Sequence, residues 1–117
     1  MVHRLRRTPI EEFTTEDLRI AIGQDVGLPH LIPLAIEILE ENPLAHGDHY
    51  PGDLLKSVLV VNSLFWRTRA DLRAVVETIL LRAEHFLQQS TAEHHEVSKE
   101  SLKEGAERFR SSVGIDR

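Results

Sequence analysis

The chain has 117 residues, which is enough for one ordinary domain with a single core, and 41% of them are hydrophobic, which excludes wholesale disorder. It contains no cysteine, so disulfides, thiolate zinc sites and a cysteine nucleophile are excluded. The net charge of -5 is uneven, because residues 10–66 hold ten acidic and only two basic residues, and such a segment repels nucleic acid and attracts basic proteins.

We expect one helical domain with an additional segment at each end. Residues 1–12 form a basic N-terminal arm, residues 13–90 a helical domain, and residues 91–117 a C-terminal extension with one further helix. The arginines of the arm are not followed by the apolar region of a signal peptide. No stretch approaches the roughly 18 consecutive apolar residues of a membrane span. We therefore expect a soluble cytoplasmic protein.

The first helix is expected to start at Thr14. Asp17 follows three residues later, which imitates a capping box, and acidic residues in a first turn suit the helix dipole. Gly23 and Gly27 bracket the predicted end of this helix.

The second helix is predicted over residues 28–41, near the centre of a bundle. Its apolar positions make one broad face at helical spacing: Leu31, Leu34, Ala35, Ile38 and Leu39, widened by Ile32 and Ile36. A narrow polar stripe remains, formed by His30, Glu37, Glu40 and Glu41. Pro33 fits poorly, so the helix either starts late or kinks there.

The rest of the chain also has helical periodicity. Residues 42–53, with two prolines and two glycines, are expected to be a loop, and a helix follows from Leu54 until Asn62-Ser63 interrupts it. The clearest helix spans about 70–89, with a seam of Leu72, Val75, Val76, Ile79, Leu80, Ala83, Phe86 and Leu87. Ser98 is a candidate cap for a last helix with a thin seam of Leu102, Ala106, Phe109 and Val113, which either docks on the bundle or forms a loosely held tail. The sequence thus predicts an all-α, single-domain bundle of about five helices.

Catalytic and metal-binding patterns are weak. His46, Asp48 and His49 lie close together, but their spacing matches no familiar zinc pattern, so we predict no metal. Asp53 is expected to cap the helix that follows it. Since phosphate-binding loops and nucleophile elbows are absent, we predict neither an enzyme nor a cofactor.

Two further features receive structural interpretations. Four arginines could form a basic edge that binds nucleic acid: Arg67, Arg69, Arg73 and Arg82. Because acidic residues alternate with them, we interpret them as solvent-exposed surface charges instead. Trp66, in an apolar run, is expected in the core rather than at an interface.

Two sequence blocks carry a family resemblance. The first is Ile22-Gly23-Gln24-Asp25-Val26-Gly27-Leu28, leading into Leu31-Ile32-Pro33-Leu34-Ala35. The second runs from Asn42 through Tyr50-Pro51-Gly52-Asp53-Leu54-Leu55, with Phe65-Trp66 downstream. Together, over roughly residues 13–90, they resemble the immunity proteins of contact-dependent growth inhibition systems. The resemblance implies a cytoplasmic protein that binds and blocks a toxin domain delivered by a neighbouring cell, and it does not identify the toxin.

The expected partner is a basic toxin domain, not nucleic acid or a membrane. Toxins that cleave nucleic acid have basic active-site surfaces, which a rigid acidic surface could cover. The partner-binding surface is predicted to run from the polar stripe of residues 28–41 into the following loop: Glu37, Glu40, Glu41, Asp48, His49 and Tyr50. The alternative is an acidic helical adaptor or regulatory protein that binds a basic partner outside any toxin system.

Overall fold

The computed structural model describes residues 13–114, and within this range all regular secondary structure is helical, with no strand. Six α-helices and one short 3₁₀-helix follow in order: α2 (Thr15–Gly23), α3 (Leu28–Glu41), α4 (Asp53–Leu59), α5 (Ser63–Thr68), α6 (Ala70–Gln89), η2 (Glu93–His95) and α7 (Glu96–Gly114). The predicted all-α class is confirmed. The predictions for residues 1–12 and for the side chain of Val113 fall outside the described part.

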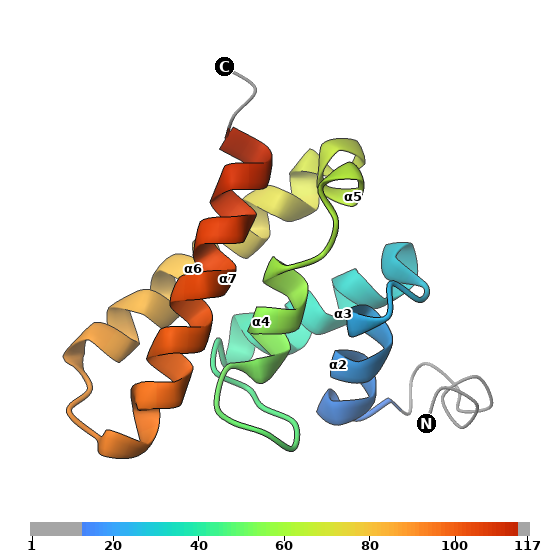
Figure 1. Cartoon of the computed structure of the whole chain (residues 1–117). Coiled ribbons are helices and arrows are strands. Elements are labelled where there is room, and N and C mark those ends of the chain that lie inside the picture. The colour runs from blue at the N-terminus through green and yellow to red at the C-terminus, as the bar shows by residue number, and fades with distance from the viewer. Residues whose placement is uncertain (1–12, 115–117) are drawn as a thin grey trace.

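Helix α4 lies at the middle of the fold, between α2 and α3 on one side and α7 on the other (Figure 1). Five of its seven residues are buried, against six of fourteen in α3. The 28–41 helix, expected near the centre, packs against α2, α4 and α6, and α4 is the more deeply buried of the two helices. Across residues 13–114, no helix combines the length and the apolar character needed to cross a membrane.

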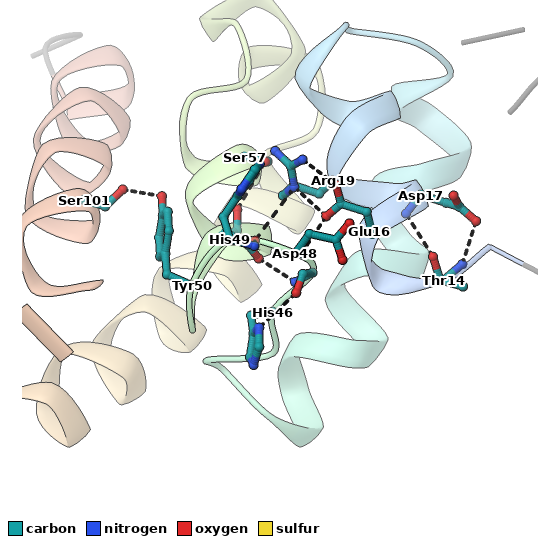
Figure 2. Close-up of polar contacts among 12 residues, drawn as sticks. Thr14, Glu16, Asp17, Arg19, His46, Asp48, His49, Tyr50, Ser57 and Ser101 are labelled. Carbon is teal, nitrogen blue, oxygen red and sulfur yellow. Dashed lines mark hydrogen bonds and ion pairs between the residues drawn. The ribbon is translucent and has the colours of Figure 1, made fainter. Parts of the chain in front are cut away.

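The start of α2 follows the sequence pattern. Thr14 Oγ1 accepts the Asp17 N–H at 3.1 Å, and Asp17 Oδ2 accepts the Thr14 N–H at 3.1 Å, which is the predicted capping box (Figure 2). Gly27 adopts a φ of 62° between α2 and α3, a left-handed conformation that glycine allows without strain.

Helix α3 has the predicted bounds and continues through Pro33, so it does not start late. The proline gives up the backbone bond that its missing N–H would have made. Its buried face is rotated from the predicted one, because Leu28, Ile32 and Ile36 are buried while Leu34 and Ile38 are only half-buried. Apolar residues surround most of the helix circumference, so their spacing alone did not identify which face packs against the core.

Helices α4 and α5 are separated at Asn62-Ser63, as the sequence predicts. Asn62 caps α5 by accepting the Phe65 N–H at 2.9 Å. Trp66 is 1% exposed and packs edge-on against Phe109 of α7, with ring centroids 5.5 Å apart, so its assignment to the core is confirmed. Phe86, placed in the core by its spacing, is instead 53% exposed.

Helix α7 docks on the bundle, which decides between the two alternatives left by the sequence. Leu102, Ala106 and Phe109 are buried against the rest of the core. Ser98 does not cap the helix: it lies inside α7, fully buried, and its hydroxyl donates to the Pro51 carbonyl at 2.6 Å. The helix thus holds the loop between α3 and α4 from the other side.

Candidate partner-binding surface

The acidic stripe of α3, defined as Glu37, Glu40 and Glu41, points to solvent. All three residues are exposed because the opposite edge of the helix is buried. Within residues 13–114, none of these carboxylates forms a hydrogen bond or an ion pair. The acidic stripe is therefore free to meet a cationic partner.

The loop at residues 42–52 is organised by a buried carboxylate. Asp53 is 2% exposed, and it accepts the Gly47 N–H at 2.8 Å and the His49 N–H at 3.1 Å. The expectation that Asp53 caps its own helix was wrong, since Gly52 occupies the cap position and the side chain turns back to the loop. Loop amides without strand or helix partners need such acceptors, which explains the arrangement.

A second carboxylate joins this loop to α2. Glu16 Oε1 accepts the Asp48 N–H at 2.9 Å, and the same carboxylate receives two hydrogen bonds from Arg19, at 2.8 and 2.5 Å (Figure 2). The Arg19 bonds, helped by the Asp48 N–H, lower the pKa of Glu16 from 4.5 to about 2. Arg19 Nε also lies 3.8 Å from Asp53 Oδ2. We call these groups, Glu16, Arg19, Asp53 and the backbone of residues 47–49, the linker network.

Part of the negative charge in residues 10–66 is used inside the fold. Glu16, Asp17 and Asp53 belong to the ten acidic residues counted in residues 10–66, yet all three have internal partners. Asp48 and His49 are held through their backbone N–H groups while their side chains remain exposed. Asp48 and His49 thus present a carboxylate and an imidazole from a fixed backbone.

Tyr50 is engaged inside the protein. It is half-buried, and its hydroxyl lies 2.5 Å from Ser101 Oγ of α7 (Figure 2). Lys56 Nζ also approaches Ser101 Oγ, at 3.2 Å. Lys56 is paired with Glu104 as well, at 3.4 Å. This cluster links α4, α7 and the loop, so the hydroxyl of Tyr50 is not available as a free contact.

The other groups singled out from the sequence do not form a common site. In the described part of the chain, no three His, Asp or Glu side chains are placed to hold a metal ion. Arg69 pairs with Asp71 at 2.9 Å, and Arg82 donates to the Glu40 carbonyl at 2.9 Å. Two of the four candidate arginines are therefore tied to acidic or carbonyl groups within the fold.

Two pockets were not apparent from the sequence. The larger, about 700 Å³, lies between α6 and α7, and its walls mix both signs of charge, including Arg110, which bridges Glu77 and Glu84. The smaller, about 380 Å³, is formed by the loop, α6 and η2, and Phe86 lines it. Neither could be read from periodicity, because each joins segments far apart in the chain.

Comparison with known proteins assigns the family. No curated protein and no solved structure matches the chain. The family model described as CDI immunity proteins matches residues 1–76, which includes the N-terminal arm, takes in α2 to α5 and ends within α6. The match covers more than half of the 117 residues and agrees with the resemblance carried by the two sequence blocks. The chain therefore belongs to the immunity proteins of contact-dependent growth inhibition.

Proposed function

We propose that this protein binds a cognate toxin domain in the cytoplasm and neutralises it by covering its active or substrate-binding surface. Family membership is the observation that carries the proposal. It acts by binding and not by catalysis, so its activity depends on the shape and charge of its surface.

The proposed contact surface centres on the acidic stripe of α3. Glu37, Glu40 and Glu41 are exposed and have no ion pair within residues 13–114, so their charge is available to a partner. Asp48 and His49 extend the surface from the loop, and Tyr50 supports it through its bond to Ser101. A partner with a basic surface, such as a toxin that acts on nucleic acid, fits this charge.

Rigidity supports the same proposal. An inhibitor that is already ordered loses less conformational entropy when it binds. The linker network fixes the loop from α2 and α4, and Ser98 fixes it from α7. The surface is therefore presented in one shape before the toxin arrives.

The test uses the cognate toxin domain, which is to be sought in the genes that neighbour this one. We expect the two purified proteins to co-elute in size-exclusion chromatography, and expression of this protein to restore growth of cells that produce the toxin. An unrelated toxin domain serves as the control. Failure to form a complex, together with no protection of growth, would overturn the proposal.

A further inference from the structure

Phe86 is a large aromatic side chain that lies at the surface and not in the core. It is 53% exposed although it belongs to the longest helix, and its ring packs edge-on against His95 with centroids 5.8 Å apart. It lines the pocket of about 380 Å³ at one end of α6. The pocket is bounded by Asn42, Pro43, Leu44, Pro51, Arg82, Phe86 and His95.

The wall formed by the loop is fixed in place. The Leu44 carbonyl accepts the Gly52 N–H at 3.1 Å, and the Pro51 carbonyl accepts the Ser98 hydroxyl at 2.6 Å. Asn42 Oδ1 accepts the Leu44 N–H at 3.1 Å. A group that enters this pocket therefore meets a preformed surface of prolines, leucine and aromatic rings, with Asn42 and Arg82 as its polar members.

Two exposed carboxylates of α3 lie next to the pocket, in the turn that contacts Arg82 of its lining. Arg82 Nη1 donates to the Glu40 carbonyl, so the last turn of α3 lies directly beside the pocket. Glu40 and Glu41 are exposed there without ion pairs in the described part of the chain. Together with the partial negative charge at the C-terminal end of α3, these two carboxylates outweigh the single positive charge of Arg82.

We propose that this pocket receives an apolar side chain of the toxin domain, flanked by lysine or arginine residues that meet the carboxylates of Glu40 and Glu41. This inference rests on the proposed function and assigns Phe86 as the principal apolar contact. Aromatic anchors surrounded by polar groups are the usual source of binding energy in interfaces. Phe86 is assigned as the aromatic contact with the partner because the hydroxyl of Tyr50 is already bonded to Ser101.

The experiment compares two exposed apolar residues of α6. Phe86→Ala removes the pocket contact, and Leu81→Ala is the matched control, because Leu81 is 54% exposed on the same helix and does not line the pocket. Titration calorimetry with the cognate toxin domain gives the dissociation constants. We expect Phe86→Ala to weaken binding by about 30-fold or more and Leu81→Ala by less than about threefold.

Two further measurements keep a loss of folding apart from a loss of contact. Thermal unfolding should be nearly the same for the wild type and Phe86→Ala, since the ring is exposed. Phe86→Leu, which keeps apolar surface in the pocket, should recover part of the affinity. A Phe86→Leu variant that binds no better than Phe86→Ala, with both folded, would count against an apolar contact.

The outcomes separate this inference from the proposed function. If the wild type does not bind the toxin domain, the proposed function itself fails. If the wild type binds and Phe86→Ala binds equally well, or Leu81→Ala loses as much affinity, only the pocket assignment fails. Sedimentation velocity tests whether a second copy of the chain fills the pocket instead. If the wild type forms a dimer that Phe86→Ala dissociates, and the toxin affinity is unchanged, the assignment would also be overturned.

Discussion

The acidic stripe of α3 and the linker network both belong to the acidic segment of residues 10–66, yet their carboxylates have different roles. In the linker network, Glu16 and Asp53 accept backbone N–H groups and contact Arg19. On the acidic stripe, Glu37, Glu40 and Glu41 are exposed and unpaired among the described residues. Net charge alone did not separate a surface that holds the fold together from one that is free to bind.

The largest expected loss of stability concerns the buried face of α3, whose packing leaves the acidic stripe exposed to solvent. Ile32→Ala should lower the free energy of unfolding by about 3–5 kcal/mol, because Ile32 is fully buried and its removal leaves a cavity. Ile38→Ala should cost less than about 2 kcal/mol, since Ile38 is half-buried. Urea denaturation of both variants gives the two values. Equal losses would mean that the packing phase of α3 is wrong.

The next effect concerns the linker network. Asp53→Ala leaves the N–H groups of Gly47 and His49 without their buried acceptor, and it should lower the free energy of unfolding by about 2–4 kcal/mol. Asp48→Ala is the matched control, because its side chain is exposed and its backbone bond is retained; about 0.5 kcal/mol or less is expected. Chemical denaturation measures both, and a similar cost for the two variants would contradict the role given to Asp53.

A smaller, pH-dependent effect is expected at Glu16. Its pKa in the folded protein, about 2, lies below the ordinary value of 4.5, so the ion pair with Arg19 stabilises the fold above about pH 4.5 and loses this contribution as the pH falls toward 2. A double-mutant cycle of Glu16→Gln and Arg19→Gln should give a coupling on the order of 1 kcal/mol at pH 7, limited by solvent screening. A coupling of the same size near pH 2 would show that the carboxylate charge is not its source.

The smallest effect on stability is expected for the acidic stripe itself. Reversing Glu37 and Glu41 to lysine should change the free energy of unfolding by about 1 kcal/mol or less, because neither side chain has a partner within residues 13–114. Thermal or urea denaturation at neutral pH tests this. A loss above about 2 kcal/mol would place these residues in the scaffold instead of at the surface.

Features that depend on neighbouring residues were predictable from the sequence. The Thr14–Asp17 capping box, the bounds of α3 and those of α6 all follow from residues three or four positions apart. The acidic stripe was also found this way, since its three carboxylates interrupt an otherwise apolar helix.

Features that depend on distant contacts were not predictable. Ser98 bonds to Pro51 and Tyr50 to Ser101 across about fifty residues of chain, and nothing local marks either pair. Phe86 fits the apolar spacing of α6, but the buried face of the helix runs through Ala83 and Leu87 there, so the ring of Phe86 lies at the surface. Asp53 differs, because its partners are only four and six residues away: its carboxylate bonds to the preceding loop and not to the helix it begins.

The most direct test of the central claim is the salt dependence of toxin association for two matched charge reversals. One variant carries Glu37→Lys and Glu41→Lys on α3, and the other carries Glu100→Lys and Glu107→Lys on α7, which are also exposed and without ion pairs in the described part of the chain. If the acidic stripe meets a basic toxin domain, the α3 variant should associate at least about tenfold more slowly at low salt and lose most of its salt dependence, while the α7 variant should stay close to the wild type. An unchanged association rate for the α3 variant, with a slow α7 variant, would contradict the claim and place the toxin on the opposite helix.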